Sequence, residues 1–496
     1  MVSSIVFAAD LPPATLSGRV GRGELVRLAT GVYTSDVTSD SAAVVGREWP
    51  VIVGRLMPAA VITDRSAPTG GPVDGVLYLA HDSRARELDL PGLAVSARRG
   101  AGPLQGDAAL PDGLFMAGKG RGLAENTRPS RARSGRQRRT LDDAELGDWV
   151  DRICQIDGDE RLSRFRADAE RVADEVGAPV DGVQRLSRLV GAALGTQQTD
   201  TGSAALAARQ AKLPYDQDRL RRFGMLIEAL RDTAPQNRPV SDTAAARWEF
   251  LPFFEAYFSN FIEGTEFEID EAAAIIYEDK QIPGRADDSH DLTGTYLVVN
   301  DLAEMSTTAA SASEFLQLLR SRHATILAGR PEKNPGQFKE RANQAGSSSF
   351  VLPGLVPGTL SVGWERLGEL DTAFERAVYM MFLVAEVHPF DDGNGRLARV
   401  MMNAELVSGG QGRIMIPTVF REDYLGALRR QTRADDPSVL IKTLRFGEDY
   451  TAQIDFSDRA EAIKQLTRTN AFDDPNSDER LTLPSRLDDV AAGKFR

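Results

Sequence analysis

The stretch VHPFDDGNGRLARV, positions 387–400, gathers several side chains that can do chemistry. His388 opens it and is one of only four histidines in 496 residues. An imidazole that titrates near neutral pH suits a general base. Pro389 should end the preceding helix. Phe390 is the apolar side chain of the loop that follows and can anchor that loop in the core.

The second half of the stretch has the residue types of a site for several phosphates. Gly393 and Gly395 flank Asn394 and let successive backbone N–H groups point at one spot, which at the start of a helix makes an anion-binding nest. Arg396 and Arg399 are three residues apart and share a helix face. A carboxylate beside phosphates indicates a divalent cation, with Mg²⁺ as the first candidate. The alternative is a capped loop with a structural histidine and surface arginines.

Two helices should position this loop. The segment LDTAFERAVYMMFLVAEV, 370–387, is apolar on more than one face, which predicts a buried helix that ends at His388. The segment RLARVMMNAELVSGG, 396–410, predicts a second helix that is stopped by two glycines. The residues PFDDGNG between them should therefore form a tight loop between two packed helices.

At every position the stretch resembles the Fic family motif, His–Pro–Phe–x–Asp/Glu–Gly–Asn–Gly–Arg–x–x–Arg. Fic proteins are all-helical enzymes that mostly transfer AMP from ATP to a hydroxyl group of a target protein. The residues by themselves leave open which phosphorus is attacked, and AMP transfer is what the resemblance implies. Gly395 fits that reaction, because kinase-like relatives carry a different residue at this position.

The resemblance also implies roles for individual residues. His388 would deprotonate the Ser, Thr or Tyr hydroxyl of the target, and Asp392 would hold the Mg²⁺ that accompanies ATP. Asp391 falls at the variable position of the motif and is given no role. Five further residues would bind the phosphates, the first three at the phosphorus under attack and the two arginines at the departing phosphates: Gly393, Asn394, Gly395, Arg396 and Arg399.

A second segment, WEFLPFFEAYFSNFIEGTEF at 248–267, has aromatic residues at helical spacing, so its plain interpretation is a core helix. Its SNFIEG portion resembles the inhibitory motif of Fic proteins, Ser/Thr–x–x–x–Glu–Gly/Asn. That resemblance assigns Ser259, Glu263 and Gly264 to a brake on the enzyme. Glu263 would pair with Arg399, and an arginine held by a carboxylate cannot also hold the γ-phosphate. ATP would then bind weakly or with a misaligned α-phosphate.

Between the two motifs, residues 335–360 are rich in Gly, Ser and Pro and include the β-capable run SSFVL. This region resembles the Fic flap, a hairpin that lays the target segment beside the histidine by strand addition. An ordinary long loop is the alternative. His323 falls on an amphipathic helix and is expected to be structural, whereas His81 and His290 are expected in loops.

The N-terminal region has a different character. Residues 12–34 predict a short helix from Ala14 to about Val20 and two strands around a turn at 30–31. The segment RGELVRL…GVY resembles the winged helix of AbiE-type antitoxin regulators, which implies DNA binding. A complete helix-turn-helix needs more helices upstream, and only about ten residues precede Leu11. A small adaptor module that binds no DNA is an equal alternative.

The chain is long enough for several domains. We expect a partial winged-helix module over 1–50, a small α/β domain over 51–140, helical sequence over 141–245, the Fic domain over 246–458 and a polar tail over 459–496. Six arginines lie between positions 128 and 139 and predict a solvated basic linker, with phosphate binding as the alternative. The expected fold class is mainly α, with a Fic-type helical core and a β-hairpin flap behind a small winged-helix or α+β region.

Composition narrows the function classes. Apolar residues make up 42% and charged residues 26%, which is typical of globular proteins, and the net charge of −13 argues against a general nucleic-acid coat. The single cysteine excludes an internal disulfide and favours a reducing compartment, so we expect a cytoplasmic protein without a membrane span.

Three readings of the function remain from the sequence. The first is a self-inhibited adenylyltransferase that uses ATP and Mg²⁺ and binds its target protein at the flap. The second is removal of AMP from a modified protein at the same site. The third is an antitoxin-like transcription regulator with an appended Fic module. Fic proteins are often dimers, so a homodimer is also expected.

Overall fold

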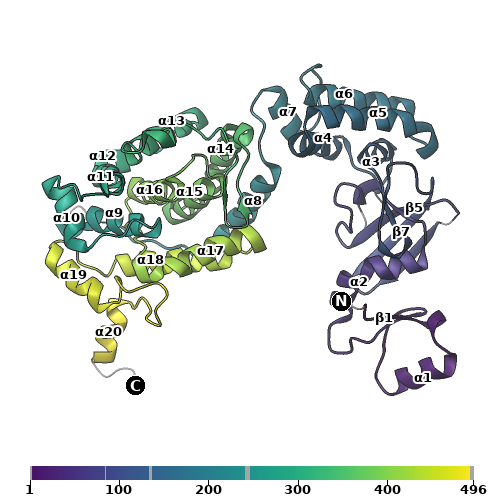
Figure 1. The fold of residues 1–496 in the computed structure, drawn as a ribbon, viewed down its shortest axis with the longest axis horizontal. Coiled ribbons are helices and arrows are strands. Elements are labelled where there is room, and N and C mark those ends of the chain that lie inside the picture. Colours follow the sequence, from purple (N-terminus) through teal and green to yellow (C-terminus); the bar gives the residue numbers. More distant parts are fainter. Residues whose placement is uncertain (1–2, 84, 133–136, 241–245, 492–496) are drawn as a thin grey trace. The chain divides into compact units, whose positions relative to one another are not determined.

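The computed structural model describes residues 3–83, 85–132, 137–240 and 246–491 (Figure 1). The chain forms two compact units, Met1–Lys212 and Leu213–Arg496. Most of the regular structure is helical, and strands lie mainly in the first unit, as the sequence predicted. No helix within the described ranges is both long and apolar enough to cross a membrane.

The first unit begins with a small antiparallel sheet and continues with a larger mixed one. The small sheet has the strand order β1-β3-β2, and its helix and hairpin lie where the sequence predicted them. The larger sheet has the order β6-β7-β5-β4-β9-β8, with β5–β7 and β4–β9 parallel. The elements are β1 (Ile5–Phe7), α1 (Pro13–Gly21), β2 (Val26–Ala29), β3 (Val32–Thr34), α2 (Ser41–Leu56), β4 (Val61–Ile62), β5 (Val76–His81), β6 (Arg86–Leu90), β7 (Leu93–Arg99), β8 (Ala108–Ala109), β9 (Phe115–Met116) and α3 (Lys119–Asn126).

Four further helices complete the first unit, and the rest of the region predicted as helical lies in the second. They are α4 (Asp143–Asp157), α5 (Asp159–Val176), α6 (Val180–Ala193) and α7 (Ala204–Gln210). Together with α3 they enclose their own apolar core. The boundary between the units, at 212–213, therefore falls inside the predicted stretch 141–245.

The arginine-rich segment is partly built into the fold, so the prediction of a solvated linker was wrong for part of it. Arg139 lies over the ring of Tyr78, 5.2 Å from its centroid, and its Nη1 is 2.9 Å from Oδ2 of Asp64. Asp64 is fully buried, and a buried carboxylate needs a cationic or hydrogen-bonding partner. Arg133 and Arg136 lie outside the described residues.

The second unit is built around an antiparallel pair of buried helices, α15 (Ala373–Val387) and α16 (Asn394–Ser408), which lie at its centre in Figure 1. Neighbours cover α15 on several sides, which explains why its sequence is apolar on more than one face. Helices α8 (Gln217–Arg231) and α14 (Val356–Glu365) pack on α15, and α9 (Leu251–Ile262), α11 (Ala286–Asn300), α12 (Leu302–Met305) and α13 (Ala312–Ile326) pack on α16. The second unit also contains α10 (Ile269–Glu278), α17 (Arg421–Ala434) and α18 (Ser438–Thr451).

Two regions of the second unit, predicted as a flap and as a polar tail, both contain regular structure. The region predicted as a flap contains a short hairpin, β10 (Gln344–Ala345) and β11 (Ser348–Ser349). The region predicted as a polar tail contains α19 (Arg459–Arg468) and α20 (Pro484–Ala491), and Ala462 and Leu466 of α19 are fully buried in the core. The core of the second unit therefore extends beyond residue 458.

Close packing of α11 against α13 gives a direct test of this architecture. A Cβ atom on Gly294 of α11 would lie 2.6 Å from the carbonyl oxygen of Thr325. Gly426 of α17 has no atom within 4 Å of its Cβ position. We expect Gly294→Ala to lower the free energy of unfolding by about 1–3 kcal/mol, and Gly426→Ala to raise it by about 0.5–1 kcal/mol. Denaturant unfolding of both variants measures this, and equal effects would contradict the packing described.

Candidate functional site

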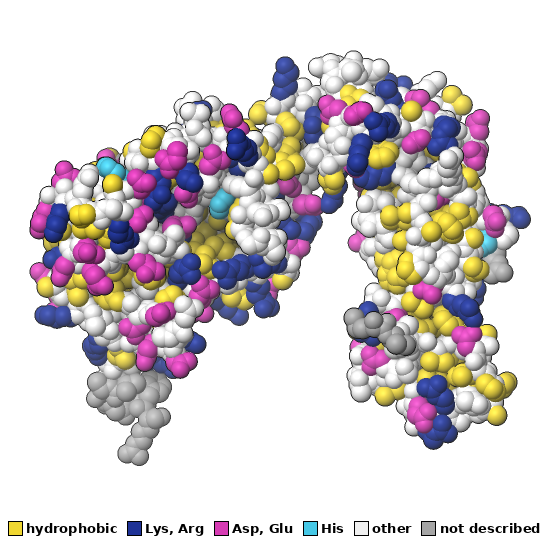
Figure 2. Space-filling view, in the orientation of Figure 1, with side chains coloured by type: hydrophobic (Ala, Val, Ile, Leu, Met, Phe, Trp, Pro, Cys, Tyr) yellow, Lys and Arg dark blue, Asp and Glu magenta, His cyan; other side chains and the backbone are white. Residues whose placement is uncertain are grey.

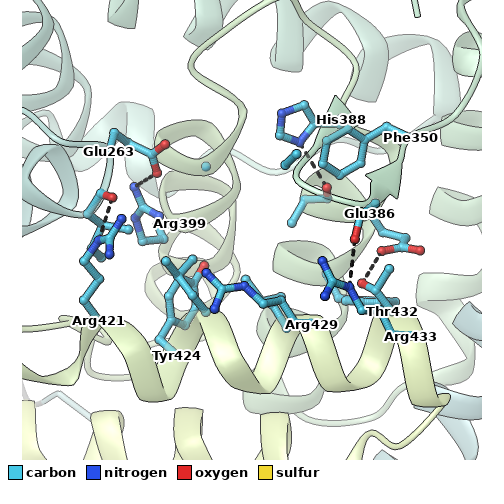
Figure 3. A pocket seen from close by; sticks show the side chains of 18 of the residues that line it. Glu263, Phe350, Glu386, His388, Arg399, Arg421, Tyr424, Arg429, Thr432 and Arg433 are labelled. Carbon is cyan, nitrogen blue, oxygen red and sulfur yellow. Dashed lines mark hydrogen bonds and ion pairs between the residues drawn. The ribbon is translucent and has the colours of Figure 1, made fainter. Parts of the chain in front are cut away.

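A cavity of about 410 Å³ lies in the second unit beside the loop between α15 and α16. In Figure 2 this unit shows a hollow with an apolar floor and Lys and Arg side chains along one rim. Figure 3 shows how the lining side chains converge on it from α9, α15, α16, α17 and the flap hairpin. The labelled residues are Glu263, Phe350, Glu386, His388, Arg399, Arg421, Tyr424, Arg429, Thr432 and Arg433.

His388 follows the last residue of α15 in a left-handed conformation, with φ 52°, that turns its ring into the cavity. Its Nδ1 lies 3.3 Å from the carbonyl oxygen of Ala385. A carbonyl can only accept, so Nδ1 carries the proton and Nε2 carries the lone pair. The ring stacks on Phe350, with centroids 3.8 Å apart. Burial lowers the pKa of His388 to about 4, so the imidazole is neutral at physiological pH.

The loop after His388 is closed by Asn394. Its amide oxygen accepts from the N–H of Phe390 at 2.9 Å, and its amide nitrogen donates to the carbonyl of Phe390 at 2.9 Å. Phe390 itself is fully buried, as expected of an anchor. In this state both polar atoms of the Asn394 side chain are used to hold the loop. The groups that remain to bind an anion are therefore the backbone N–H groups at the start of α16.

His323 on α13 contacts the same loop through its ring and through a hydrogen bond. Its ring stacks on Phe390, with centroids 3.7 Å apart. Nδ1 accepts the N–H of Gly336 at 2.9 Å, so Nε2 must be the protonated nitrogen that donates to the carbonyl of Asp392 at 2.9 Å. Burial lowers the pKa of His323 to about 4. The expectation that this histidine is structural is confirmed, and the structure it supports is the loop that follows His388.

The start of α16 is covered by a carboxylate. A Cβ atom on Gly395 would lie only 2.2 Å from Oε1 of Glu263, so the absence of a side chain at Gly395 leaves room for that carboxylate. Glu263 caps α9, and Gly264 follows it with φ 90°. An anion at a helix N-terminus meets the positive end of the helix dipole and unpaired N–H groups. The Glu263 carboxylate thus occupies the place where the sequence predicted a phosphate nest.

Arg399 is held by the same segment through three contacts. Its Nη2 lies 2.7 Å from Oε1 of Glu263 and donates to the carbonyl of Ser259 at 2.8 Å, while its Nε donates to Oγ of Ser259 at 3.0 Å. The Arg399 side chain is only 6% exposed. Burial alone would lower the pKa of Arg399, but Glu263 and Tyr424 together outweigh it and the net direction is upward. The predicted Glu263–Arg399 pair is therefore present.

Arg396 and Asp392 do not line the cavity in this state. Nη1 of Arg396 lies 2.6 Å from Oδ2 of the buried Asp291 and donates to Oδ1 of Asn260 at 3.2 Å. Its Nε is buried and has no partner among the described residues. Asp392 is 39% exposed and accepts the N–H of Gly393 at 2.7 Å. The two arginines of the motif thus point to different partners.

Sequence reasoning missed one whole wall of the cavity. Helix α17 presents residues three or four apart along one face, namely Arg421, Tyr424, Leu425, Leu428, Arg429, Thr432 and Arg433. Arg421 donates to the carbonyl of Ile262 at 3.0 Å and so caps the helix that carries the predicted brake. The spacing in REDYLGALRRQTR was visible in the sequence, but nothing in it indicates which other helix this face meets.

Comparisons with known proteins address the motif region. The model of the Fic/DOC family matches residues 314–406. A probable protein adenylyltransferase of Aquifex aeolicus is 30% identical over 127 residues, which are 25% of this chain and 36% of that protein. The protein adenylyltransferase Fic of Nematostella vectensis is 25% identical over 249 residues, 47% of this chain and 56% of that protein.

The solved structure of Fic-1 from C. elegans, residues 134–508, aligns with 66% of this chain and 90% of its own, with a TM-score of 0.38 and 17% identity. The chain spans about a third to just over a half of the two curated relatives named above. The family match contains the flap hairpin, α15, the motif loop and most of α16, which supply His388, Asn394 and Arg399. Residues 314–406 of this chain are a Fic/DOC family domain.

Proposed function

We propose that this protein is a self-inhibited adenylyltransferase that transfers AMP from ATP to a hydroxyl side chain, Ser, Thr or Tyr, of a target protein. The observation that carries the proposal is the position of the Glu263 carboxylate, over Gly395 at the start of α16 and paired with Arg399. A site in which the start of α16 and the Arg399 guanidinium hold one anion suits a phosphate group of ATP when that carboxylate is absent. The names of the curated relatives, protein adenylyltransferases, support this reaction.

In the reaction His388 accepts a proton at Nε2 from the target hydroxyl. The hydroxyl oxygen attacks the α-phosphorus of ATP, the bond from that phosphorus to the bridging oxygen breaks, and pyrophosphate leaves. Two features support His388 as the base: its Nδ1–H is fixed on the carbonyl of Ala385, and its lowered pKa keeps Nε2 unprotonated at neutral pH. The helix N-terminus at Gly393 and Gly395 stabilises the charge on the phosphorus under attack.

Asp392 fits the role of a ligand for Mg²⁺ that arrives with ATP. Its carboxylate is partly exposed and lies in the loop just before the predicted nest. Among the described residues no group of three His, Cys, Asp or Glu side chains could hold a metal by itself. Magnesium usually takes one or two carboxylates and completes its shell with phosphates and water, so one carboxylate suffices. The ion would neutralise charge on the phosphates.

Glu263 acts as the brake by electrostatics. While Arg399 is bound to Glu263 and Ser259, it cannot hold the γ-phosphate, and the carboxylate repels any phosphate at Gly395. ATP then binds weakly or with its α-phosphate out of line. Misplacement by about 1 Å can cost about a hundredfold in rate.

Removal of AMP from a modified protein is a second candidate at the same site. The observation that favours it is that Oε2 of Glu263 makes no hydrogen bond to a described residue while Oε1 holds Arg399. A carboxylate with one free oxygen can orient a water molecule for attack.

DNA binding by the N-terminal region, a cytoplasmic setting and a homodimer remain predictions.

The first prediction concerns release of the brake. Glu263→Gly should free Arg399 and raise Mg²⁺-dependent self-labelling from ATP carrying its label on the α-phosphate by about a hundredfold. His388→Ala added to this variant should abolish the labelling. Glu266→Gly is the matched control, because Glu266 is an exposed carboxylate three residues further along the chain. It should leave labelling at the level of the intact chain.

The labelling result also distinguishes AMP transfer from phosphate transfer and from AMP removal. Labelling of the Glu263→Gly variant only from ATP with a γ-phosphate label would make the protein a kinase and refute AMP transfer. Release of AMP from a modified protein by the intact chain, lost in Glu263→Gly, would favour the second candidate.

The second prediction concerns the protonation of His388. With ¹³C-labelled histidine, the imidazole resonance that disappears in His388→Ala should titrate near pH 4 in the intact chain. Unfolded histidine titrates near 6.5, so protons bind the unfolded chain first. The contribution of His388 to stability is therefore complete above about pH 6.5 and is lost as pH falls towards 4. A midpoint above 6 would contradict the buried, neutral imidazole.

A further inference from the structure

Arg219 on α8 makes a bridge that the family match does not include. Its Nη1 donates to the Glu386 carboxylate on α15, and its Nη2 donates to the backbone carbonyl of Ser349 in β11. Residue 219 lies well before the matched segment 314–406. Glu386 lines the cavity two residues before His388. One buried side chain therefore joins the cavity wall to the flap hairpin.

The Glu386 carboxylate has other partners, so Arg219 is not needed merely to neutralise it. Nη1 of Arg222 lies 3.0 Å from Oε1 of Glu386, and Oγ1 of Thr432 donates to Oε2 at 2.7 Å. Arg222 also donates from Nε to Asp435 at 3.1 Å. The two arginines thus share a carboxylate and differ in their second partner, which is the flap backbone for Arg219 and the end of α17 for Arg222.

The hydrogen-bond pattern of the hairpin shows which groups face outward. Gln344 pairs with Ser349, and the N–H of Phe350 donates to the carbonyl of Asn343 at 3.3 Å. Antiparallel pairs alternate between bonded and non-bonded types, so the 344–349 pair is non-bonded and its N–H and C=O groups point away from the hairpin. On the β11 side the outward carbonyl of Ser349 is taken by Arg219. On the β10 side Gln344 is exposed and makes no hydrogen bond within the described part of the chain.

The base of the flap is tied to the catalytic loop. The backbone N–H of Lys339 donates to the carbonyl of Pro389 at 2.9 Å, and the amide of Asn343 donates to the carbonyl of Phe390 at 3.0 Å. Phe350 stacks on the ring of His388. With its base fixed in this way, the orientation of the hairpin depends on what holds its tip. Arg219 holds the β11 backbone from a buried position, and the exposed Arg433 adds a side-chain contact, in which its Nε donates to Oγ of Ser348 at 3.1 Å.

We propose that Arg219 is a positioning residue that clamps the flap by its β11 edge and leaves the β10 edge, at Gln344, as the edge that an extended segment of the target protein joins. An open strand edge recruits an extended chain through its unpaired N–H and C=O groups. The clamp would fix the distance from that added strand to His388. The choice of edge rests on the proposed function, whereas the clamp itself does not.

The clamp is tested by hydrogen–deuterium exchange of the full chain. Arg219→Gln should raise amide exchange in the peptide that covers residues 343–350 by about tenfold or more, because the tip of the hairpin loses its buried donor. Arg222→Gln, which loses the same carboxylate but no flap contact, should keep exchange there within about twofold of the intact chain. Equal effects of the two variants, or no effect of Arg219→Gln, would overturn the clamp.

A second substitution at the same position keeps the test decisive if Arg219→Gln fails to fold. Arg219→Lys keeps a positive charge for Glu386 but has one ammonium group in place of the planar fork that reaches both partners. If Arg219→Gln unfolds, the lysine variant should show the same local rise in exchange with an unchanged melting temperature. A lysine variant that protects 343–350 as well as the intact chain does would overturn the clamp.

The choice of edge is tested with two prolines at the paired positions, in the Glu263→Gly background. Proline removes an N–H group, and at 344 or 349 the group removed points outward, so the hairpin keeps its own bonds. The acceptor is the full chain carrying His388→Ala, and the readout is AMP transfer to it in trans. Gln344→Pro should lower transfer about tenfold or more, with the apparent KM for ATP within about twofold, and Ser349→Pro should keep most of the transfer.

The outcomes separate the two proposals. The reverse pattern, or equal transfer by both proline variants, would overturn the assignment of the β10 edge. If Glu263→Gly transfers no AMP to any acceptor, the proposed function fails, while the exchange experiment still decides whether Arg219 clamps the flap.

Discussion

A guanidinium that is already bound on two sides has little left to offer a phosphate, and Arg399 is in that position. Glu263 and Ser259 occupy it, and the same Glu263 carboxylate covers the helix N-terminus at Gly395. Helix α9 is the support for this pair. Its Phe253, Phe254 and Phe258 are fully buried, and each large aromatic side chain removes about 150–250 Å² of surface from water. Displacement of Glu263 from Arg399 is therefore confined to the turn at Glu263, since α9 cannot leave without exposing the core.

The sequence was sufficient to predict those features that depend on residues close together in the chain. The helices before and after His388 and the buried Phe390 could be predicted, because they depend on periodicity, Pro and Gly positions and a motif with many constraints. The hairpin within 335–360 was predicted from its resemblance to the Fic flap. The Glu263–Arg399 pair could be predicted only through the family resemblance. The aromatic spacing of 248–267 by itself predicted a core helix, and the structure bears this out as well, since α9 is both a core helix and the carrier of Glu263.

The remaining parts of the site depend on tertiary contacts that one sequence does not reveal. Arg396 was expected among the phosphate ligands, but a buried carboxylate on α11, Asp291, holds it. Arg219 bridges two residues that lie more than 100 positions further along the chain, and the α17 wall contacts Ile262 through Arg421 and Glu386 through Thr432. No local pattern predicts such pairs. The same reasoning explains why the position of Arg139 was not predicted. Arg139 pairs with Asp64 in the first unit, although its neighbours in the sequence resemble a solvated linker.

The central claim is that one carboxylate competes with the phosphates of ATP for Arg399 and the start of α16. The most direct measurement is a calorimetric titration of Mg²⁺–ATP into the intact chain and into Glu263→Gln, which keeps the shape of the side chain and removes its charge. The account predicts binding to Glu263→Gln that is tighter by about tenfold or more, and loss of that gain when Arg399→Met is added. Equal affinities of the intact chain and Glu263→Gln would contradict it.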